Sequence, residues 1–354
     1  MTRVHTAVLI GRFQPFHNGH LALLEQALQV AQQVIVVLGS AHQARSPKNP
    51  WVWEERRKMI DDCLPTRVKG RVQFVPIRDY YDLPRWVAEV QRWVEALVPP
   101  SGASIGLISH EKDASSTYLR HFPTWQLIEL PRQGEVDATP LREQFWNLDE
   151  QPAAQVQAAL AAALPEPVLQ ALTAWRETPA YAAVREEAQA LAAYREAWDC
   201  AAFAPVFVTV DALVVCAGHV LLVQRGHSPG KGLLALPGGF VEQRDTIEES
   251  AQRELQEETG LALTLEAWQT ARQGVEIFDH PDRSLRGRTI THVYVLHLPG
   301  DTLPEVNGGD DAAAADWVPL KELWELEPQF FEDHFHILRT CFERFGGGPQ
   351  PSLP

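Results

Sequence analysis

The chain has 354 residues, and its hydrophobic fraction of 45 % and charged fraction of 22 % exclude extended disorder and fibrous repeats. At roughly 150 residues per domain, this length predicts two domains, each with a core of its own. The net charge of -15 comes from the second part of the chain, because residues 146–354 hold 31 acidic and 14 basic side chains. Such a surface argues against general binding to nucleic acid.

Strands and helices alternate through the first part of the sequence. The apolar run 4–10 predicts a strand, and the leucine spacing after it predicts a helix over 19–33. The further strand candidates are 34–38, 72–77, 104–109 and 125–130, and the further helix candidates are 51–63 and 87–97. This alternation predicts a parallel sheet. Ligands should gather where its strands end, in loops 11–18, 39–50, 78–85 and 109–116.

A change of pattern near residue 205 marks a second fold. From residue 141 to about 201 the sequence is rich in Ala, Gln, Glu and Leu, which predicts structural helices. Two apolar β runs, 206–215 and 220–223, then flank Gly218 and predict a hairpin. We therefore predict a first domain over 1–185, a helical linker over 186–204, a second domain over 205–345 and a flexible tail over 346–354.

The cysteines and the apolar runs indicate in which cell compartment the protein is expected and whether it crosses a membrane. The four cysteines lie far apart and suggest neither a disulfide framework nor a zinc site. No run approaches the roughly 18 apolar residues of a membrane span, and the start of the chain lacks a signal-peptide pattern. We expect a soluble, cytoplasmic protein with no membrane partner.

The loop after the first strand carries the first cluster of chemical groups, and residues 11–20 read GRFQPFHNGH. His17 and His20 stand three residues apart where a helix begins, so ring N–H groups and backbone amides can meet the same phosphate. Nucleotidyl transfer needs mainly alignment and neutralisation of charge, which these groups supply without a covalent nucleophile. The loop is therefore predicted to hold a phosphate group.

This loop resembles the HxGH signature of the nucleotidylyltransferase superfamily, in particular its nicotinamide mononucleotide (NMN) adenylyltransferase branch. The resemblance extends to residues 48–50, 55–56, 109–118 and 139–142. It implies a Rossmann-like domain in which His17 and His20 hold the phosphates of ATP through the transition state, while Mg²⁺ bridges the phosphate oxygens. Arg12 and Arg142 would neutralise the triphosphate. The residues implied to bind ATP and NMN are Gly11, Arg12, Phe13, Gly19, Trp86, Thr139 and Arg142.

Two positions of the first domain fit the family pattern less simply: one has a competing interpretation, and one departs from the pattern. Trp86 stands just after loop 78–85, and its ring could stack on a nicotinamide, with packing in the core as the competing interpretation. Asp137 stands where the family pattern has a serine, and an ionised carboxylate there would repel a triphosphate at close range.

A second cluster is the acidic run in the second domain. Within a helix, Glu254, Glu257 and Glu258 stand at relative positions 0, 3 and 4 and share one face. A hard divalent cation, Mg²⁺ or Mn²⁺, would remove their mutual repulsion. The competing interpretation, a solvated acidic helix, does not account for the glycines that flank the run.

Residues 239–261 resemble the Nudix box, GX5EX7REUXEEXGU, over its 23 positions, with Asp245 in place of the first glutamate. The resemblance implies a C-terminal Nudix α/β/α sandwich in which Glu254, Glu257 and Glu258 bind the metal and a metal-activated water attacks a diphosphate. Arg253 would hold the carboxylates together. The residues implied to support the box are Gly239, Asp245, Arg253 and Gly260.

Residues 278–291 and the end of the second domain resemble bifunctional NMN adenylyltransferase/Nudix hydrolase proteins, whose second domain is an ADP-ribose pyrophosphatase. This resemblance implies one activity that makes NAD and pyrophosphate from ATP and NMN, and another that hydrolyses ADP-ribose to AMP and ribose 5-phosphate. Arg283, Arg286 and Arg288 could contact ADP-ribose or form a salt-bridged surface ribbon. The candidates for the Nudix general base are Glu305, Asp310 and Asp311.

Two other interpretations stay open. The Nudix fold could bind ADP-ribose or NAD without cleaving it and so regulate the synthetase, although all three glutamates of the acidic run are present. Alternatively, both domains could act on other nucleotides, such as another nucleotidyl acceptor, NADH, a nucleotide sugar or a dinucleoside polyphosphate. The sequence does not decide between monomer and homo-oligomer, nor whether the two sites communicate.

Overall fold

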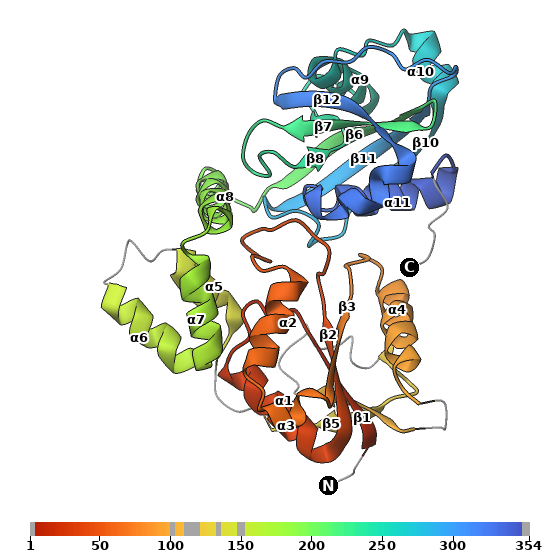
Figure 1. Cartoon of the computed structure of the whole chain (residues 1–354). Coiled ribbons are helices and arrows are strands. Elements are labelled where there is room, and N and C mark those ends of the chain that lie inside the picture. The colour runs from red at the N-terminus through yellow and green to blue at the C-terminus, as the bar shows by residue number, and fades with distance from the viewer. Residues whose placement is uncertain (1–3, 100–102, 110–120, 132–135, 147–152, 349–354) are drawn as a thin grey trace. The chain divides into compact units, whose positions relative to one another are not determined.

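The computed structural model describes residues 4–99, 103–109, 121–131, 136–146 and 153–348 (Figure 1). The chain divides into two compact units, residues 1–185 and 186–354, and each unit has a sheet of its own. Residues 110–118, part of the segment that resembles nucleotidylyltransferases, and residues 349–354 of the predicted tail lie outside the described residues.

The first unit contains the predicted parallel sheet. Its strands are β1 (Val4–Gly11), β2 (Ala31–Leu38), β3 (Val72–Pro76), β4 (Ile105–Ser109) and β5 (Gln126–Glu129). They lie in the order β3-β2-β1-β4-β5, and every pair is parallel. Because β1 is central, the loop that follows it opens at the middle of the carboxyl edge of the sheet, where ligands of such sheets bind.

The helices between these strands are α1 (Asn18–Val30), α2 (Trp53–Asp62), α3 (Thr66–Lys69) and α4 (Leu83–Ala96). The helix predicted over 19–33 ends at Val30, since the chain passes directly into β2. Helix α4 begins four residues before its predicted start, because the Asp82 carboxylate accepts the N–H of Arg85 and caps the helix. Its buried valines pack on residues of β1, β2, β3 and β4.

Four further helices complete this part of the chain, namely α5 (Ala138–Trp146), α6 (Ala153–Ala163), α7 (Glu166–Trp175) and α8 (Pro179–Glu196). Rings from α5, α7 and α8 form an aromatic cluster with Trp51, which follows the 39–50 loop. Neighbouring ring centroids in this cluster lie 5.4–6.1 Å apart. The packing of these rings on Trp51 therefore helps to fix the end of loop 39–50, one of the predicted ligand loops.

The second unit has a mixed sheet. Its strands are β6 (Val206–Cys216), β7 (His219–Arg225), β8 (Leu234–Ala235), β9 (Gly238–Phe240), β10 (Arg272–Phe278), β11 (Arg288–His297) and β12 (Ala312–Pro319). The order is β10-β11-β6-β7-β12, with β8 on β7 and β9 on β6. The predicted hairpin is present as the antiparallel pair β6 and β7. Strands β6 and β11 are parallel.

Helices cover both faces of this sheet, as expected for an α/β/α sandwich (Figure 1). One face carries α9 (Ile247–Thr259) and α10 (Leu265–Ala271), and the other carries α11 (His334–Phe345) and the 3-10 helix η2 (Leu320–Gln329). Alternate residues of β6 serve the two cores, since Ala212 and Val214 face α9 while Leu213 and Val215 face α11.

The segment 186–204 packs on the second unit. Tyr194 and Trp198 contact the ring of Phe207, with ring centroids 5.7 and 5.2 Å away. The Glu187 carboxylate accepts the backbone N–H of Gly230. None of the described helices has the length and apolar character that a membrane crossing requires.

Candidate active sites

The loop between β1 and α1 is held by contacts from other segments. The Gln14 side chain donates to the carbonyl of Trp51 (2.9 Å) and accepts the backbone N–H of Trp51 (3.1 Å). Gly11 leaves room for the Phe13 ring, because a Cβ at Gly11 would lie 2.9 Å from that ring. The loop is therefore held by contacts within the chain.

The two histidines of this loop together cap α1. His17 is the N-cap residue, and its Nδ1 accepts the N–H of His20 (3.4 Å), while Nδ1 of His20 accepts the N–H of His17 (3.3 Å). Their rings stack with centroids 3.6 Å apart. Because each Nδ1 accepts, a neutral ring carries its proton on Nε2, the atom that can donate to an anion at the helix N-terminus. Gly19 lies in the first turn of α1.

A buried arginine from α2 joins the carboxyl ends of β1 and β2. Arg56 is fully buried, and its Nη1 donates to the carbonyls of Arg12 (2.5 Å) and Gly39 (2.7 Å). Its Nη2 donates to the carbonyl of Ser40 (3.2 Å). Burial is the main cause that lowers the pKa of Arg56 to about 10. The sequence motif includes Arg56, but only the tertiary structure shows that its partners are carbonyls of two different loops.

Arg142 of α5 binds the loop of residues 12–17 between β1 and α1, hereafter the histidine loop, from a distant part of the chain. Its Nη1 donates to the carbonyl of Gln14 (2.5 Å), and its Nη2 donates to Thr139 Oγ1 (3.1 Å). Burial, followed by the charge of Arg12, lowers the pKa of Arg142 to about 10. The structure thus brings Arg12, Thr139 and Arg142 to the histidine loop, and Asp137 lies half-buried just before α5.

Two predicted ligand regions lie beside other strands of the same sheet. In loop 39–50, Ser40 Oγ donates to Asp79 Oδ2 (2.7 Å), and burial is the main cause that lowers the pKa of His42 to about 4. Trp86 lies in α4, and its ring meets Phe122 edge-on with centroids 6.2 Å apart. The core contact of Trp86 leaves its role toward nicotinamide a prediction.

The second site is built on α9, which is a helix as predicted. The helix begins with a capping box of Thr246 and Glu249, and it ends at Gly260, whose φ of 70° favours glycine. The three carboxylates are not equivalent. Glu254 is 8 % exposed and Glu258 is 5 % exposed, whereas the side chain of Glu257 is 44 % exposed.

Two glycines allow β9 to lie against these carboxylates. The backbone N–H of Gly238 donates to Glu258 Oε2 (2.9 Å). A Cβ at Gly238 would lie 2.2 Å from the carbonyl oxygen of Val210, and a Cβ at Gly239 would lie 2.5 Å from Glu254 Oε1. The close packing of β9 on α9 therefore depends on the absence of side chains at both positions.

Burial sets the electrostatics of these carboxylates. Burial raises the pKa of Glu254, and it raises the pKa of Glu258 to about 8, with the charge of Glu254 adding to the effect. Within the described ranges, no group of three or more His, Cys, Asp or Glu side chains is already gathered around one point for a metal ion. The donor set still fits a hard divalent cation, because it is made of oxygens whose negative charge is poorly solvated.

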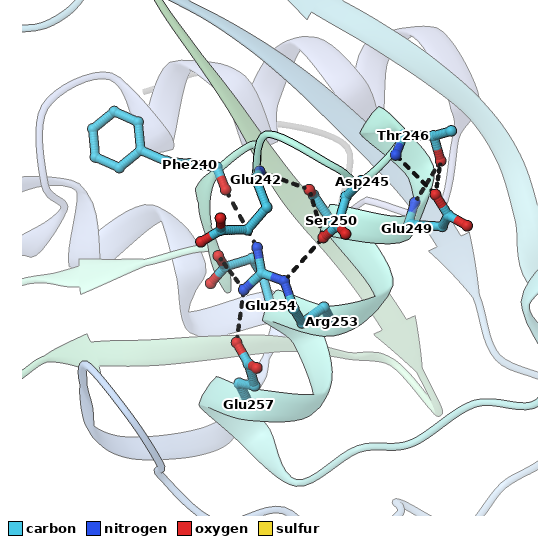
Figure 2. A network of polar contacts seen from close by, with 9 residues as sticks. All are labelled: Phe240, Glu242, Asp245, Thr246, Glu249, Ser250, Arg253, Glu254 and Glu257. Carbon is cyan, nitrogen blue, oxygen red and sulfur yellow. Dashed lines mark hydrogen bonds and ion pairs between the residues drawn. The ribbon is translucent and has the colours of Figure 1, made fainter.

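Arg253 organises the acidic groups of α9 (Figure 2). Its Nη1 donates to Glu254 Oε1 (3.0 Å) and to Glu257 Oε2 (2.7 Å), and its Nε donates to Asp245 Oδ2 (3.2 Å). Its Nη2 donates to the carbonyl of Phe240 (3.4 Å). One guanidinium therefore connects two of the predicted metal ligands with the loop that precedes the helix.

Two of the three arginines predicted to contact ADP-ribose make internal contacts. Arg283 is buried and forms a bidentate ion pair with Asp333, with both bonds at 2.9 Å. Burial outweighs this pairing and raises the pKa of Asp333 to about 6. Arg288 donates to the carbonyl of Asp279.

The third arginine lies near one that the sequence analysis missed. Arg286 lies over the rings of Phe240 and Phe331, 5.2 and 5.9 Å from their centroids, and its Nε is buried without a hydrogen-bond partner. Arg225 of β7 lies 4.4 Å from the centroid of the same Phe331 ring. The charge of Arg286 adds to burial in lowering the pKa of Arg225. The carboxylates of Glu258, Glu332 and Asp311 act in the opposite direction on Arg225.

The loop before β12 closes over the end of α9. The N–H of Asn307 donates to the carbonyl of Thr259 (2.9 Å), and the N–H of Gly309 donates to the carbonyl of Glu258 (3.2 Å). Of the candidates for the general base, Asp310 adds to the raised pKa of Glu254, and Asp311 acts on Arg225. Glu305, the third candidate, is exposed earlier in the same loop.

Two family models match the chain. The NUDIX domain matches residues 206–341, and the Cytidylyltransferase-like model matches residues 8–94. The two matches fall on the second and the first unit, respectively. They agree with the architecture of the two sheets.

Relatives of each unit and of nearly the whole chain are known. A nicotinamide/nicotinic acid mononucleotide adenylyltransferase of Acinetobacter baylyi is 38 % identical over 52 % of this chain and 93 % of its own. An ADP-ribose pyrophosphatase of Methanocaldococcus jannaschii is 36 % identical over 37 % of this chain and 70 % of its own. A bifunctional NMN adenylyltransferase/ADP ribose pyrophosphatase of Francisella tularensis, solved with AMP and a manganese ion, is 34 % identical with a TM-score of 0.86. That alignment covers 97 % of this chain and all of the solved chain.

Proposed function

Since the chain belongs to the family of bifunctional NMN adenylyltransferase/ADP-ribose pyrophosphatases, we propose that it carries both activities. The domain over 1–185 transfers AMP from ATP to NMN and gives NAD and pyrophosphate. The domain over 205–345 hydrolyses ADP-ribose to AMP and ribose 5-phosphate. The observation that carries the proposal is that one chain holds both a histidine pair at a helix N-terminus and a glycine-lined set of carboxylates on another helix.

In the first domain, catalysis comes from alignment and charge neutralisation. The Nε2–H groups of His17 and His20 donate to phosphate oxygens of ATP, and Arg12 and Arg142 neutralise the triphosphate as the phosphate of NMN displaces pyrophosphate. This assignment is supported by the Nδ1 bonds that orient both rings. The further residues assigned to ATP and NMN binding are Gly11, Phe13, Gly19, Trp86 and Thr139.

In the second domain, a bound Mg²⁺ or Mn²⁺ ion supplies positive charge that favours deprotonation of water and stabilises the cleaved diphosphate. Glu254, Glu257 and Glu258 provide oxygen ligands for it, and Arg253 keeps two of them ordered. The general base is assigned to one of the loop carboxylates Glu305, Asp310 and Asp311, of which Asp310 lies close enough to Glu254 for its charge to act there.

Substrate recognition in the second domain is assigned to Arg225 and Arg286. Their guanidiniums lie over the same ring, that of Phe331, and the buried Nε of Arg286 lacks a hydrogen-bond partner, which a diphosphate oxygen would supply. Arg225 already donates through Nε to the carbonyl of Pro229 and would add its positive charge. Arg283 already neutralises Asp333, and Arg288 bonds to a carbonyl, which favours structural roles for these two arginines. A sensor without catalysis is less favoured, because every carboxylate of the acidic run is retained.

The test is a pair of product analyses by mass spectrometry. The full chain with ATP, Mg²⁺ and NMN should give NAD and pyrophosphate, and with ADP-ribose it should give AMP and ribose 5-phosphate. A panel of other mononucleotides, NADH, nucleotide sugars and dinucleoside polyphosphates defines the substrate range. Binding of ADP-ribose without any cleavage would favour the sensor instead.

We also propose that the protein works in the cytoplasm. All four cysteines are free thiols, which a reducing compartment maintains.

A further inference from the structure

A buried hydroxyl in α9 has unusual partners. Ser250 is fully buried, and its Oγ accepts the N–H of Glu242 (3.2 Å) and donates to Asp245 Oδ2 (3.2 Å) (Figure 2). A serine inside a helix commonly bonds to the carbonyl one turn earlier, or points to solvent. Here the hydroxyl instead bonds to two residues of the loop between β9 and α9.

This contact continues to the carboxylates of the site. The same oxygen of Asp245 that accepts from Ser250 also accepts from Arg253 Nε (3.2 Å). Arg253 in turn donates to Glu254 and Glu257 through Nη1. A continuous chain of hydrogen bonds therefore runs from the loop backbone, through Ser250, to two proposed metal ligands (Figure 2).

The short side chain of Asp245 bears on the role of Ser250. A glutamate at position 245, as in the Nudix pattern, would reach about 1.5 Å further, the length of one C–C bond, and could bond to Arg253 on its own. The aspartate meets Arg253 through a single oxygen at 3.2 Å. Without Ser250, that oxygen would lose its second donor, and the N–H of Glu242 would lose its acceptor.

We propose that Ser250 is a positioning residue of the second active site, which holds Asp245 so that Arg253 keeps Glu254 and Glu257 in place for a divalent cation. The inference rests on the proposed metal-dependent function of this domain. It predicts that removing a hydroxyl that touches neither metal nor substrate weakens metal binding.

The test measures Mn²⁺ binding to the full chain by electron paramagnetic resonance, without substrate. Ser250→Ala should raise the dissociation constant for Mn²⁺ by about 10-fold, the lower end of the effect of outer-shell residues, and should lower kcat/KM for ADP-ribose by a similar factor. Thr246→Ala is the matched control, since it also removes a hydroxyl at the start of α9 but one that bonds only within the capping box. It should lower the melting temperature and leave the Mn²⁺ affinity unchanged.

The decisive comparison adds Asp245→Glu. The double variant Asp245→Glu/Ser250→Ala should bind Mn²⁺ as tightly as Asp245→Glu alone, because the longer carboxylate reaches Arg253 directly. If Ser250→Ala does not fold, Ser250→Cys, which keeps a weaker donor, should give a smaller loss that Asp245→Glu also removes.

Two results would overturn the inference. One is an unchanged Mn²⁺ affinity in Ser250→Ala, and the other is an equal loss in the Asp245→Glu background. A wild-type protein that binds Mn²⁺ but does not cleave ADP-ribose would contradict the proposed function and leave this comparison valid. A wild-type protein without Mn²⁺ affinity would contradict both.

Discussion

The two sites of this chain differ in how far apart in the sequence their parts lie. In the first domain the histidine loop is held by Trp51 and Arg142, and the strand ends by Arg56, through bonds that join residues 16 to 128 positions apart. In the second domain the carboxylates, their arginine and the supporting serine come from the single stretch 238–261. The proposed phosphate site, made of donors, is thus assembled by tertiary packing, whereas the proposed cation site, made of acceptors, is mostly local to one helix.

This difference has a consequence for mutation. In the first domain the supporting arginines bond to backbone carbonyls, so removing one should disturb both the fold and the site. In the second domain the main cost is the burial of carboxylates away from water, so removing one ionisable group should stabilise the metal-free fold while it destroys the site.

The largest effect is expected for Glu258→Gln. The amide oxygen can still accept the N–H of Gly238, but the side chain can no longer ionise. ADP-ribose hydrolysis should fall by on the order of 10³, since the cation that activates water loses a ligand. The melting temperature without metal should rise, because the raised pKa of Glu258 shows that burial disfavours its charge. Calorimetry with and without Mn²⁺ measures both parts, and a lower metal-free melting temperature would contradict the proposed electrostatics.

The next effect is expected for His20→Ala. NAD synthesis should fall by about 10²–10³, the usual cost of one donor that stabilises transition-state charge. ADP-ribose hydrolysis by the same preparation is the internal control and should be unchanged, since the two sites share no residue. A parallel loss of both activities in a folded protein would refute separate sites.

A stability effect is expected for Arg56→Met, which keeps most of the side-chain volume. The carbonyls of Arg12, Gly39 and Ser40 lose their donor, so unfolding should become easier by about 2–4 kcal/mol. Denaturant titration of the full chain measures the change. Arg57→Met on the neighbouring, exposed position of α2 is the control and should have little effect. Equal effects of the two variants would show that the carbonyl bonds of Arg56 are unimportant.

The smallest effect concerns pH. The pKa of His42 is about 4 in the folded protein, below its ordinary value, so the unfolded chain takes up a proton first as the pH falls. Stability that is complete above about pH 6.5 is therefore lost progressively toward pH 4. The test variant is His42→Asn, because asparagine tolerates the left-handed φ of 66° at this position. It should reduce the drop in melting temperature between pH 7 and 5 by about 2–4 °C, which corresponds to roughly 1 kcal/mol of stability in a unit of this size. A drop as large as that of the wild type would exclude His42 as its source.

The parallel sheet, the β6–β7 hairpin and the α9 helix were predictable because each depends on periodicity or turn residues in one short stretch. Helix starts were less predictable. Helix α4 begins early because of the capping carboxylate of Asp82, a signal that hydrophobic periodicity does not carry. Arg225 was missed because nothing in its local sequence distinguishes it from a surface arginine, and its relation to Phe331 and Arg286 depends on three segments of the fold.

The sequence by itself determined the kinds of chemical groups at each site and, for the second site, their shared helix face, because residues at helical spacing lie on one face without any tertiary contact. Only the tertiary structure decided how much each group is buried. It made Glu258 a buried carboxylate with a pKa of about 8 and left Glu257 half exposed. It also paired Arg283 with Asp333 and brought Ser250 within hydrogen-bond distance of Asp245. Burial and long-range hydrogen bonds depend on which segments pack together, and that information is not local to any motif.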